Sequence, residues 1–361
     1  MNTARSSMIC VALLGFACSN PGAPDTRREL LVSWSTGLIV PSYEGLSLEA
    51  GELESSLDAL CAAPSAETLD ASKAAWLAAQ GSLKQAEVFA FGPFSRPGFR
   101  IGPQLDSWPA RVDDVEEVLS SETPIDPPAI AGFGVWRKGL PVVEYLLYPP
   151  EGDAVALANS PRRCEYLRSL GAEVANRADE IYMAWSPEGG NFAEQLSGAG
   201  RTSTAFVSLS AAFGEIVNRM GFTVENIRTN KLGHPLGEDS GGAATPDYVE
   251  SRFSARSIDN IHDNLDGIET LYFGDDARNI PGLRRYVTER GADYDAEMTD
   301  ALAASHQSLD AIGAPLSAAI TSAPDRVRDA SARLGELQAL IQVDLIGALG
   351  LSLSFNDNDG D

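Results

Sequence analysis

Apolar residues recur every three or four positions along most of this chain of 361 residues. The clearest example lies between residues 202 and 220, where five large apolar side chains share one helical face: Phe206, Leu209, Phe213, Ile216 and Met220. The first part of the chain shows no strand-like alternation of apolar and polar residues. The pattern therefore predicts an all-α fold.

The same spacing predicts the other helices. Pro41 is expected to bend or interrupt the first of them, and the run Ser65-Ala-Glu-Thr opens the second. The expected helices span about 26–61, 65–83, 115–119, 141–148, 161–185, 202–220, 250–272 and 334–345.

The first eighteen residues resemble a bacterial export signal. Arg5 precedes an apolar run that is too short to span a bilayer, and Cys18 follows it. We expect lipidation of Cys18, a polar tether over residues 19–25, and sorting to the outer membrane because Ser19 follows the cysteine. The alternative is cleavage nearby, which would leave a soluble periplasmic protein.

Four cysteines are present, and two of them belong to the export signal. This leaves two cysteines, Cys61 and Cys164. An even number of cysteines in an exported chain favours a disulfide. Two buried free thiols are the alternative.

The formal net charge is −24, which argues against a nucleic-acid partner because phosphate binding depends on Lys and Arg. A strongly acidic surface attracts cations and repels other copies of the chain. The charge alone identifies no ligand.

Within the segment from Gly134 to Tyr148, one carboxylate, Glu144, interrupts the apolar run that opens with Pro141. Pro141 suits the first turn of a helix, and on that helix Glu144 shares a face with Leu140 and Leu147. A charge that faces a core needs a partner, a hydrogen-bond network or a ligand. A carboxylate held by the helix dipole or by a salt bridge is the structural alternative.

The segment from Phe91 to Pro109 is rich in Gly, Pro and aromatic residues. A loop of this length inside a compact domain is often functional, although packing over the end of a bundle is equally compatible with its composition. Its polar and amphipathic residues are Arg96, Arg100, Asp106 and Trp108.

The run from Gly139 to Glu144 resembles the Gly-x-His-x-x-Glu signature of the imelysin-like proteins, once catalogued as M75 peptidases, with Pro141 at the histidine position. Further segments are similar to that family: the Leu-Cys-x-x-Pro around Cys61, Lys231-Leu-Gly-His-Pro-Leu-Gly, Glu250-Ser-Arg-Phe-Ser and the ending Phe355-Asn-Asp-Asn-Asp-Gly-Asp. The resemblance implies two four-helix bundles related by duplication, with a site between them. We expect the halves at residues 26–155 and 156–361.

Peptidase chemistry finds little support in the residues. A zinc peptidase needs two histidines one helical turn apart and a third ligand, and the three histidines of this chain are not so spaced. We expect His262 and His306 on solvated helix faces and His234 in a loop. A metallopeptidase of the M75 type therefore remains the alternative function.

The resemblance implies a binding site where loops of the two halves meet, in a protein of bacterial iron uptake that binds iron or a protein partner. Its expected residues are Trp136, Glu144, Asn230, Lys231, His234, Glu250, Ser251 and Ser254. Glu144 and Glu250 are the expected hard-oxygen ligands for a cation. If Lys231 instead neutralises Glu144, the site would suit an organic anion or a protein.

Overall fold

The computed structural model describes residues 25–95, 100–150 and 152–353. The predicted all-α class is confirmed, since the regular structure in these ranges is helical except for two short antiparallel strands, β1 (Gly274–Asp275) and β2 (Ile280–Pro281). The expectations for the export signal, Cys18, most of the tether, Arg96 and the acidic ending lie outside the described residues.

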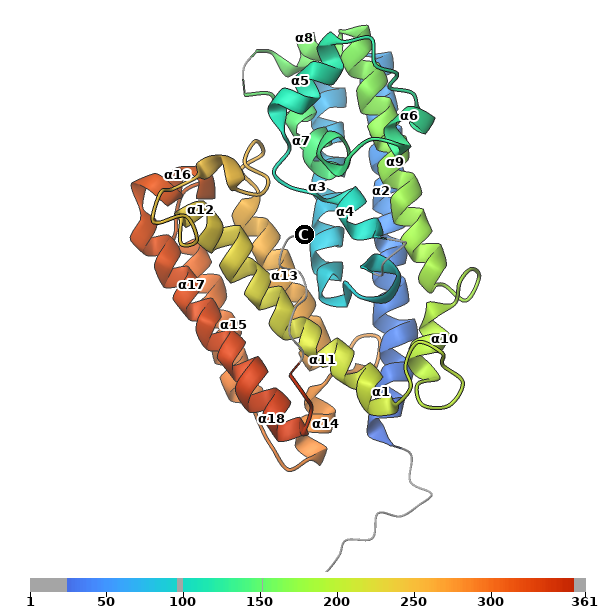
Figure 1. Cartoon of the computed structure of the whole chain (residues 1–361), viewed down its shortest axis with the longest axis vertical. Helices are drawn as coiled ribbons and strands as arrows, with labels where there is room; N and C mark the ends of the chain where they lie inside the picture. The colour runs from blue at the N-terminus through green and yellow to red at the C-terminus, as the bar shows by residue number, and fades with distance from the viewer. Residues whose placement is uncertain (1–24, 96–99, 151, 354–361) are drawn as a thin grey trace, which may run out of the picture.

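Two groups of helices lie side by side (Figure 1). The first group consists of α2 (Val40–Ala62), α3 (Ala66–Ala86), α7 (Leu140–Leu147) and α9 (Pro161–Trp185). The second consists of α11 (Leu209–Asn226), α13 (Ser257–Phe273), α15 (Asp295–Asp310) and α17 (Pro324–Ala339). Because α9 packs lengthwise against α2, residues 161–185 group with the first bundle, beyond the expected boundary at 155/156.

Shorter elements connect and cap these groups. The remaining α-helices are α1 (Thr26–Trp34), α4 (Ile101–Leu105), α5 (Val112–Ser120), α6 (Pro127–Ala131), α8 (Ala154–Ala158), α10 (Phe192–Ser197), α12 (His234–Leu236), α14 (Arg284–Glu289), α16 (Leu316–Ser322) and α18 (Ile346–Leu349). The 3₁₀ turns are η2 (Glu87–Phe89), η3 (Gly92–Phe94), η4 (Val135–Arg137) and η6 (Pro246–Tyr248). Three π-helical segments are η1 (Ser35–Ile39), η5 (Ile227–Gly233) and η7 (Leu340–Leu345).

The helical chain continues through Pro41. Segment η1 widens the helix just before this proline, which lies in the first turn of α2. A wide turn accommodates a residue that has no N–H to donate. Ser65 caps α3 as expected, because its side chain accepts from the N–H of Thr68 while the Thr68 hydroxyl accepts from the N–H of Ser65.

Two predicted helices begin later than expected. The helix predicted from residue 202 begins at Leu209, where the Ser208 side chain accepts a hydrogen bond from the N–H of Ala211 at 3.0 Å. The helix predicted from residue 250 begins at Ser257. The residues before it form turns, in which Ser251 has φ 48° and Ala255 has φ 62°, and these angles are not those of a right-handed helix. The sequence prediction had extended the helix into this loop.

The predicted disulfide is present. Cys61 at the end of α2 and Cys164 near the start of α9 are bonded, with Cα atoms 5.4 Å apart and a separation of 103 positions in sequence. The bond ties together two helices that the expected boundary had separated.

The two bundles meet where α3 runs beside α13. Gly267 permits the close approach, because a Cβ atom there would lie 2.4 Å from the carbonyl oxygen of Gln85. Within the described ranges, none of the helices has both the length and the apolar character that crossing a membrane requires.

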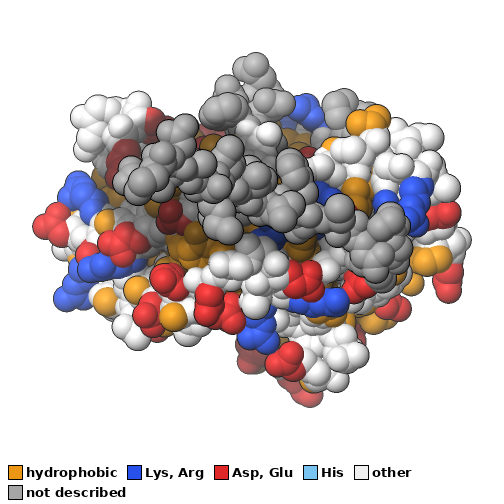
Figure 2. Space-filling model, turned by 90° about the horizontal axis from the view of Figure 1, so that it is seen from below, with side chains coloured by type: hydrophobic (Ala, Val, Ile, Leu, Met, Phe, Trp, Pro, Cys, Tyr) orange, Lys and Arg blue, Asp and Glu red, His pale blue; other side chains and the backbone are white. Residues whose placement is uncertain are grey.

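Acidic and basic side chains lie next to one another over the end of the molecule seen from below (Figure 2). Helices α1 and α14 lie at this end in Figure 1, and Arg285 Nη2 is 2.6 Å from Glu29 Oε2 between them. Both side chains are about two-fifths exposed, at 43% and 40%, so this pair is a surface ion pair of modest energy.

Candidate functional site

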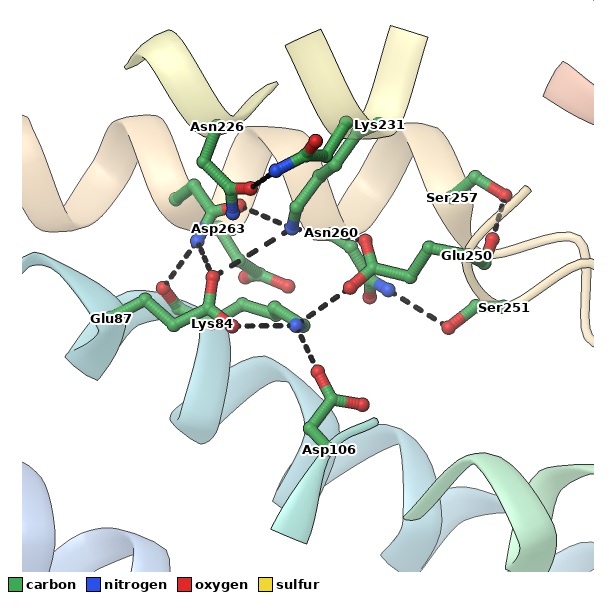
Figure 3. Close-up of polar contacts among 12 residues, drawn as sticks. Lys84, Glu87, Asp106, Asn226, Lys231, Glu250, Ser251, Ser257, Asn260 and Asp263 are labelled. Carbon is green, nitrogen blue, oxygen red and sulfur yellow. Dashed lines mark hydrogen bonds and ion pairs between the residues drawn. The ribbon is translucent and has the colours of Figure 1, made fainter. Parts of the chain in front are cut away.

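Five charged side chains meet at the interface of the two bundles (Figure 3). The first bundle contributes Lys84 from the last turn of α3, Glu87 just after it, and Asp106 directly after α4. The second contributes Lys231 from η5 and Glu250 from the turns before α13. We call these five residues the buried charge cluster.

The carboxylate of Glu250 lies between two ammonium groups. Lys84 Nζ is 2.6 Å from Glu250 Oε1, and Lys231 Nζ is 3.0 Å from Glu250 Oε2. Lys84 Nζ also lies 2.7 Å from Glu87 Oε1 and contacts Asp106 Oδ2. Lys84 and Glu250 are buried, at 0% and 2% exposure, so these ion pairs act where water screens them little.

Amide side chains complete the hydrogen bonding of the cluster. Asn264 of α13 accepts from Lys231 Nζ at 2.7 Å and donates to Glu87 Oε2 at 2.7 Å. Its amide also donates to the backbone carbonyl of Lys84 at 2.8 Å, which fixes the end of α3 against α13. Asn260 donates to Ser251 Oγ at 2.9 Å and so supports the turn that carries Glu250.

The three carboxylates differ in their ionisation. Burial alone would raise the pKa of Glu250, but Lys231 and Lys84 outweigh it and hold this pKa at about 2. Burial opposes the two lysines at Glu87 as well, yet its pKa is lowered. At Asp106, burial together with Glu250 and Glu87 raises the pKa despite the contact with Lys84. Asp106 is therefore the carboxylate of the cluster whose negative charge the two lysines compensate least.

A cavity of about 300 Å³ adjoins the cluster between the bundles. Glu87 and Asp106 line it on the side of the cluster. The other lining residues are Ala90, Phe94, Gly102, Pro103, Ser107, Trp108, Trp136, Arg219, Phe222, Thr223 and Asn226. Asp106 Oδ1 is buried and has no hydrogen-bond partner among the residues that the structure describes. A buried carboxylate oxygen without a partner, in the wall of a cavity, can accept a hydrogen bond or bind a cation.

Glu144 lies outside this cluster and also joins the two bundles. Its Oε1 accepts from the backbone N–H of Ser254 at 2.7 Å and from the Ser254 hydroxyl at 2.8 Å. The side chain is 2% exposed, and burial raises the pKa of Glu144 to about 7 although the Ser254 hydrogen bonds lower it. The pairing of Lys231 with Glu144 that we considered is wrong, because Lys231 pairs with Glu250 and, at 3.7 Å, with Glu87.

This pKa predicts how stability depends on pH. Folded Glu144 keeps its proton up to about pH 7, whereas an ordinary glutamate loses it near 4.5, so its contribution to the free energy of unfolding falls as pH rises through that window. We expect Glu144→Gln to gain stability relative to the natural chain between about pH 5 and about pH 8, by up to about 3 kcal/mol. Urea unfolding of both proteins at the two pH values measures the gain. If the difference in free energy of unfolding between the variant and the natural chain were the same at both pH values, the raised pKa of Glu144 would be contradicted.

The glycine of the signature has a structural role. Gly139 adopts φ 83° and ψ −177°, a conformation that is essentially restricted to glycine. A Cβ atom there would lie 2.5 Å from the carbonyl oxygen of Leu105. The signature thus packs directly against the segment that ends in Asp106.

Several of the predicted site residues meet at the interface. Lys231 and Glu250 belong to the buried charge cluster, Glu144 pairs with Ser254, and Ser251 supports the turn between them. Trp136 lines the cavity, where the guanidinium of Arg111 lies 4.4 Å from the centre of its ring.

Two other predictions fall outside the cluster. Asn230 is exposed and reaches the cavity only through Asn226, to which it donates at 2.6 Å. His234 is 36% exposed, and its Nδ1 lies 2.5 Å from Asp239 Oδ2. His262 and His306, which we expected on solvated helix faces, are partly exposed and in contact with each other.

Sequence reasoning missed Lys84, Glu87 and Asn264 as site residues and noted Asp106 only as a polar loop residue. A signal for Lys84 was present, since it follows the buried Trp76 and Gln80 at helical spacing and so shares their face. The rule that singled out Glu144, a charge within an apolar face, applies equally to Lys84.

The fold and sequence are similar to those of known proteins. The sequence model of the imelysin family, Peptidase_M75, matches residues 39–342. Iron-regulated protein A of Synechococcus elongatus is 26% identical over 321 residues, which cover 88% of this chain and 84% of that protein.

Two solved structures share the fold. An imelysin-like protein from Psychrobacter arcticum 273-4 superposes with a TM-score of 0.73 at 19% identity, covering 91% of this chain and 97% of the other. A protein from Parabacteroides distasonis described as a candidate iron-regulated protein A precursor gives a TM-score of 0.74 at 18% identity, with coverage of 90% and 95%.

Proposed function

Because this chain belongs to the imelysin family, we propose that it is an exported, non-catalytic protein of bacterial iron uptake that binds iron as cargo between its two bundles. The proposed site is the cavity beside the buried charge cluster, with Asp106 and Glu87 as the first ligands. This choice moves the cation from Glu144 and Glu250, the ligands expected from sequence, to two neighbouring carboxylates.

The observation that carries the proposal is the unpartnered Oδ1 atom of Asp106. Glu250, which is held between two lysines, and Glu144, which is held by Ser254, are not among the residues that line the cavity. Asp106 and Glu87 line the cavity together with Ser107, Thr223 and Asn226, which carry hydroxyl and amide oxygens, and with Arg219. Carboxylate, hydroxyl and amide oxygens are the donors that suit a hard cation.

The link to iron comes from a relative, and the proposed route of export comes from the start of the chain. The relative in Synechococcus elongatus is named an iron-regulated protein, and its similarity covers most of both chains. The apolar run before Cys18 supports export, and we propose a lipid anchor at that cysteine.

A peptidase is disfavoured by the residues around the signature. Pro141 stands where the family signature has histidine, and a proline side chain offers no ligand atom. Glu144 is buried and already accepts two hydrogen bonds from Ser254. A peptidase would show hydrolysis that is lost in Glu144→Gln, whereas the binding function predicts no hydrolysis in either protein.

Iron titration of the full chain and of Asp106→Asn tests the proposed site. We expect one equivalent of Fe²⁺ or Fe³⁺ to bind, with the affinity reduced at least about 100-fold in the variant because a ligand charge is removed while the shape is kept. Asp58→Asn is the matched control, since Asp58 is an ion-paired aspartate of α2 outside this cavity. Equal binding by all three proteins, or no binding by any, would refute the site.

A further inference from the structure

Two of the three histidines of this chain meet between α13 and α15 of the second bundle. His262 lies on α13 and His306 on α15, and they are 44 residues apart in sequence. Their rings are parallel within 2°, with centroids 4.8 Å apart, and their Nδ1 atoms are 2.5 Å apart. At that distance one of the two nitrogens must present a lone pair.

Carboxylates flank both histidines. On α13, Asp266 and Glu269 follow His262 at positions i+4 and i+7 and so share its face. Ligand atoms of Asp266, Glu269 and His306 all lie within 4.8 Å of one another. Across α15, Asp310 Oδ1 is 3.1 Å from His262 Nε2.

The distance between His306 and Glu269 matches metal coordination better than a hydrogen bond. His306 Nε2 and Glu269 Oε1 are 3.5 Å apart, which is long for a hydrogen bond. Two ligands bonded to one tetrahedral zinc ion at about 2.0–2.2 Å are roughly 3.3–3.5 Å from each other. The side chains of His262 and His306 are 22% and 24% exposed, so an ion could enter from solvent while the helices hold the imidazoles in place.

From this convergence we infer a second cation site, independent of the proposed cavity site, in which His306, Asp266 and Glu269 bind a divalent transition-metal ion such as Zn²⁺, while His262 orients the His306 ring through its Nδ1 atom. Imidazole nitrogen and carboxylate oxygen are the donors that zinc takes in such sites. Because α13 presents Asn260 and Asn264 to the bundle interface and His262 and Asp266 to α15, one helix carries residues of both sites.

Titration of the full chain with Zn²⁺ alone, followed by calorimetry, tests this site. We expect His306→Ala to weaken binding by at least about 100-fold. We expect Asp266→Asn, an exposed substitution, and His262→Ala, which removes the group against His306 Nδ1, each to weaken it by at least about 10-fold. His234→Ala is the matched control, because His234 is a half-exposed histidine outside the cluster, and it should change the affinity less than about twofold. Unchanged binding in the two His variants would overturn the site.

A second readout separates this site from the cavity between the bundles. Co²⁺ bound to the histidine cluster should give visible absorption bands that Asp106→Asn preserves and His306→Ala abolishes. Loss of the bands in Asp106→Asn with retention in His306→Ala would place the ion in the cavity and overturn the inference.

Discussion

Lys84→Met should destabilise the protein by about 3–5 kcal/mol at neutral pH. Methionine keeps the unbranched length of lysine but removes the ammonium group that contacts Glu87, Asp106 and Glu250. Glu87 and Glu250 would then share Lys231, and Asp106 would lose its ion pair with Lys84. An unpaired buried charge is costly. Chemical denaturation measures the loss.

Two comparisons make this prediction specific. Arg285→Met breaks the exposed pair with Glu29 and should cost less than about 1 kcal/mol. Combining Lys84→Met with Glu250→Gln removes one of the uncompensated charges and should recover part of the stability. A loss in Lys84→Met no larger than that in Arg285→Met would mean that the cluster does not hold the bundles together.

Loss of the disulfide should cost about 4–5 kcal/mol, because it closes a loop of 103 residues in the unfolded chain. The bond joins the start of α9 to the end of α2. These two helices form the most extensive helix–helix contact of the first bundle. Cys61→Ser, Cys164→Ser and the double variant should therefore lose the same free energy of unfolding, since each removes the same bond.

Reduction provides the control for the cysteine variants. Dithiothreitol should lower the stability of the natural chain to that of the variants and leave the variants unchanged. Additive losses in the two single variants, with no effect of dithiothreitol, would instead describe two buried free thiols.

Local sequence patterns predicted most of the long helices and the disulfide, but they missed α15 (Asp295–Asp310) and did not determine how the helices group. The stripe on α9 predicts a helix at 161–185, yet nothing in its spacing distinguishes packing against α2 from packing against the second bundle. The boundary at 155/156 followed the prolines at 149 and 150 and the implied duplication, whereas α9 packs with the helices that precede it.

The residues of the candidate site also fall into those that sequence could identify and those that depend on helix packing. Glu144 was identified because a charge in an apolar stretch needs a partner, and Ser254 is that partner. The approach of Asp106 to Lys84 and Glu250 depends on how α4 and the turns before α13 pack on α3, which spacing does not encode. The contact of His262 with His306 likewise depends on the packing of α13 and α15.

The most direct test of the account is to locate iron in crystals of the iron-loaded full chain by anomalous diffraction at the iron edge. The account predicts a peak between the bundles, within bonding distance of Asp106 Oδ1 and beside Glu87. Iron bound only at Glu144, or only at His262 and His306, would contradict the central claim that the cavity beside the buried charge cluster is the cargo site.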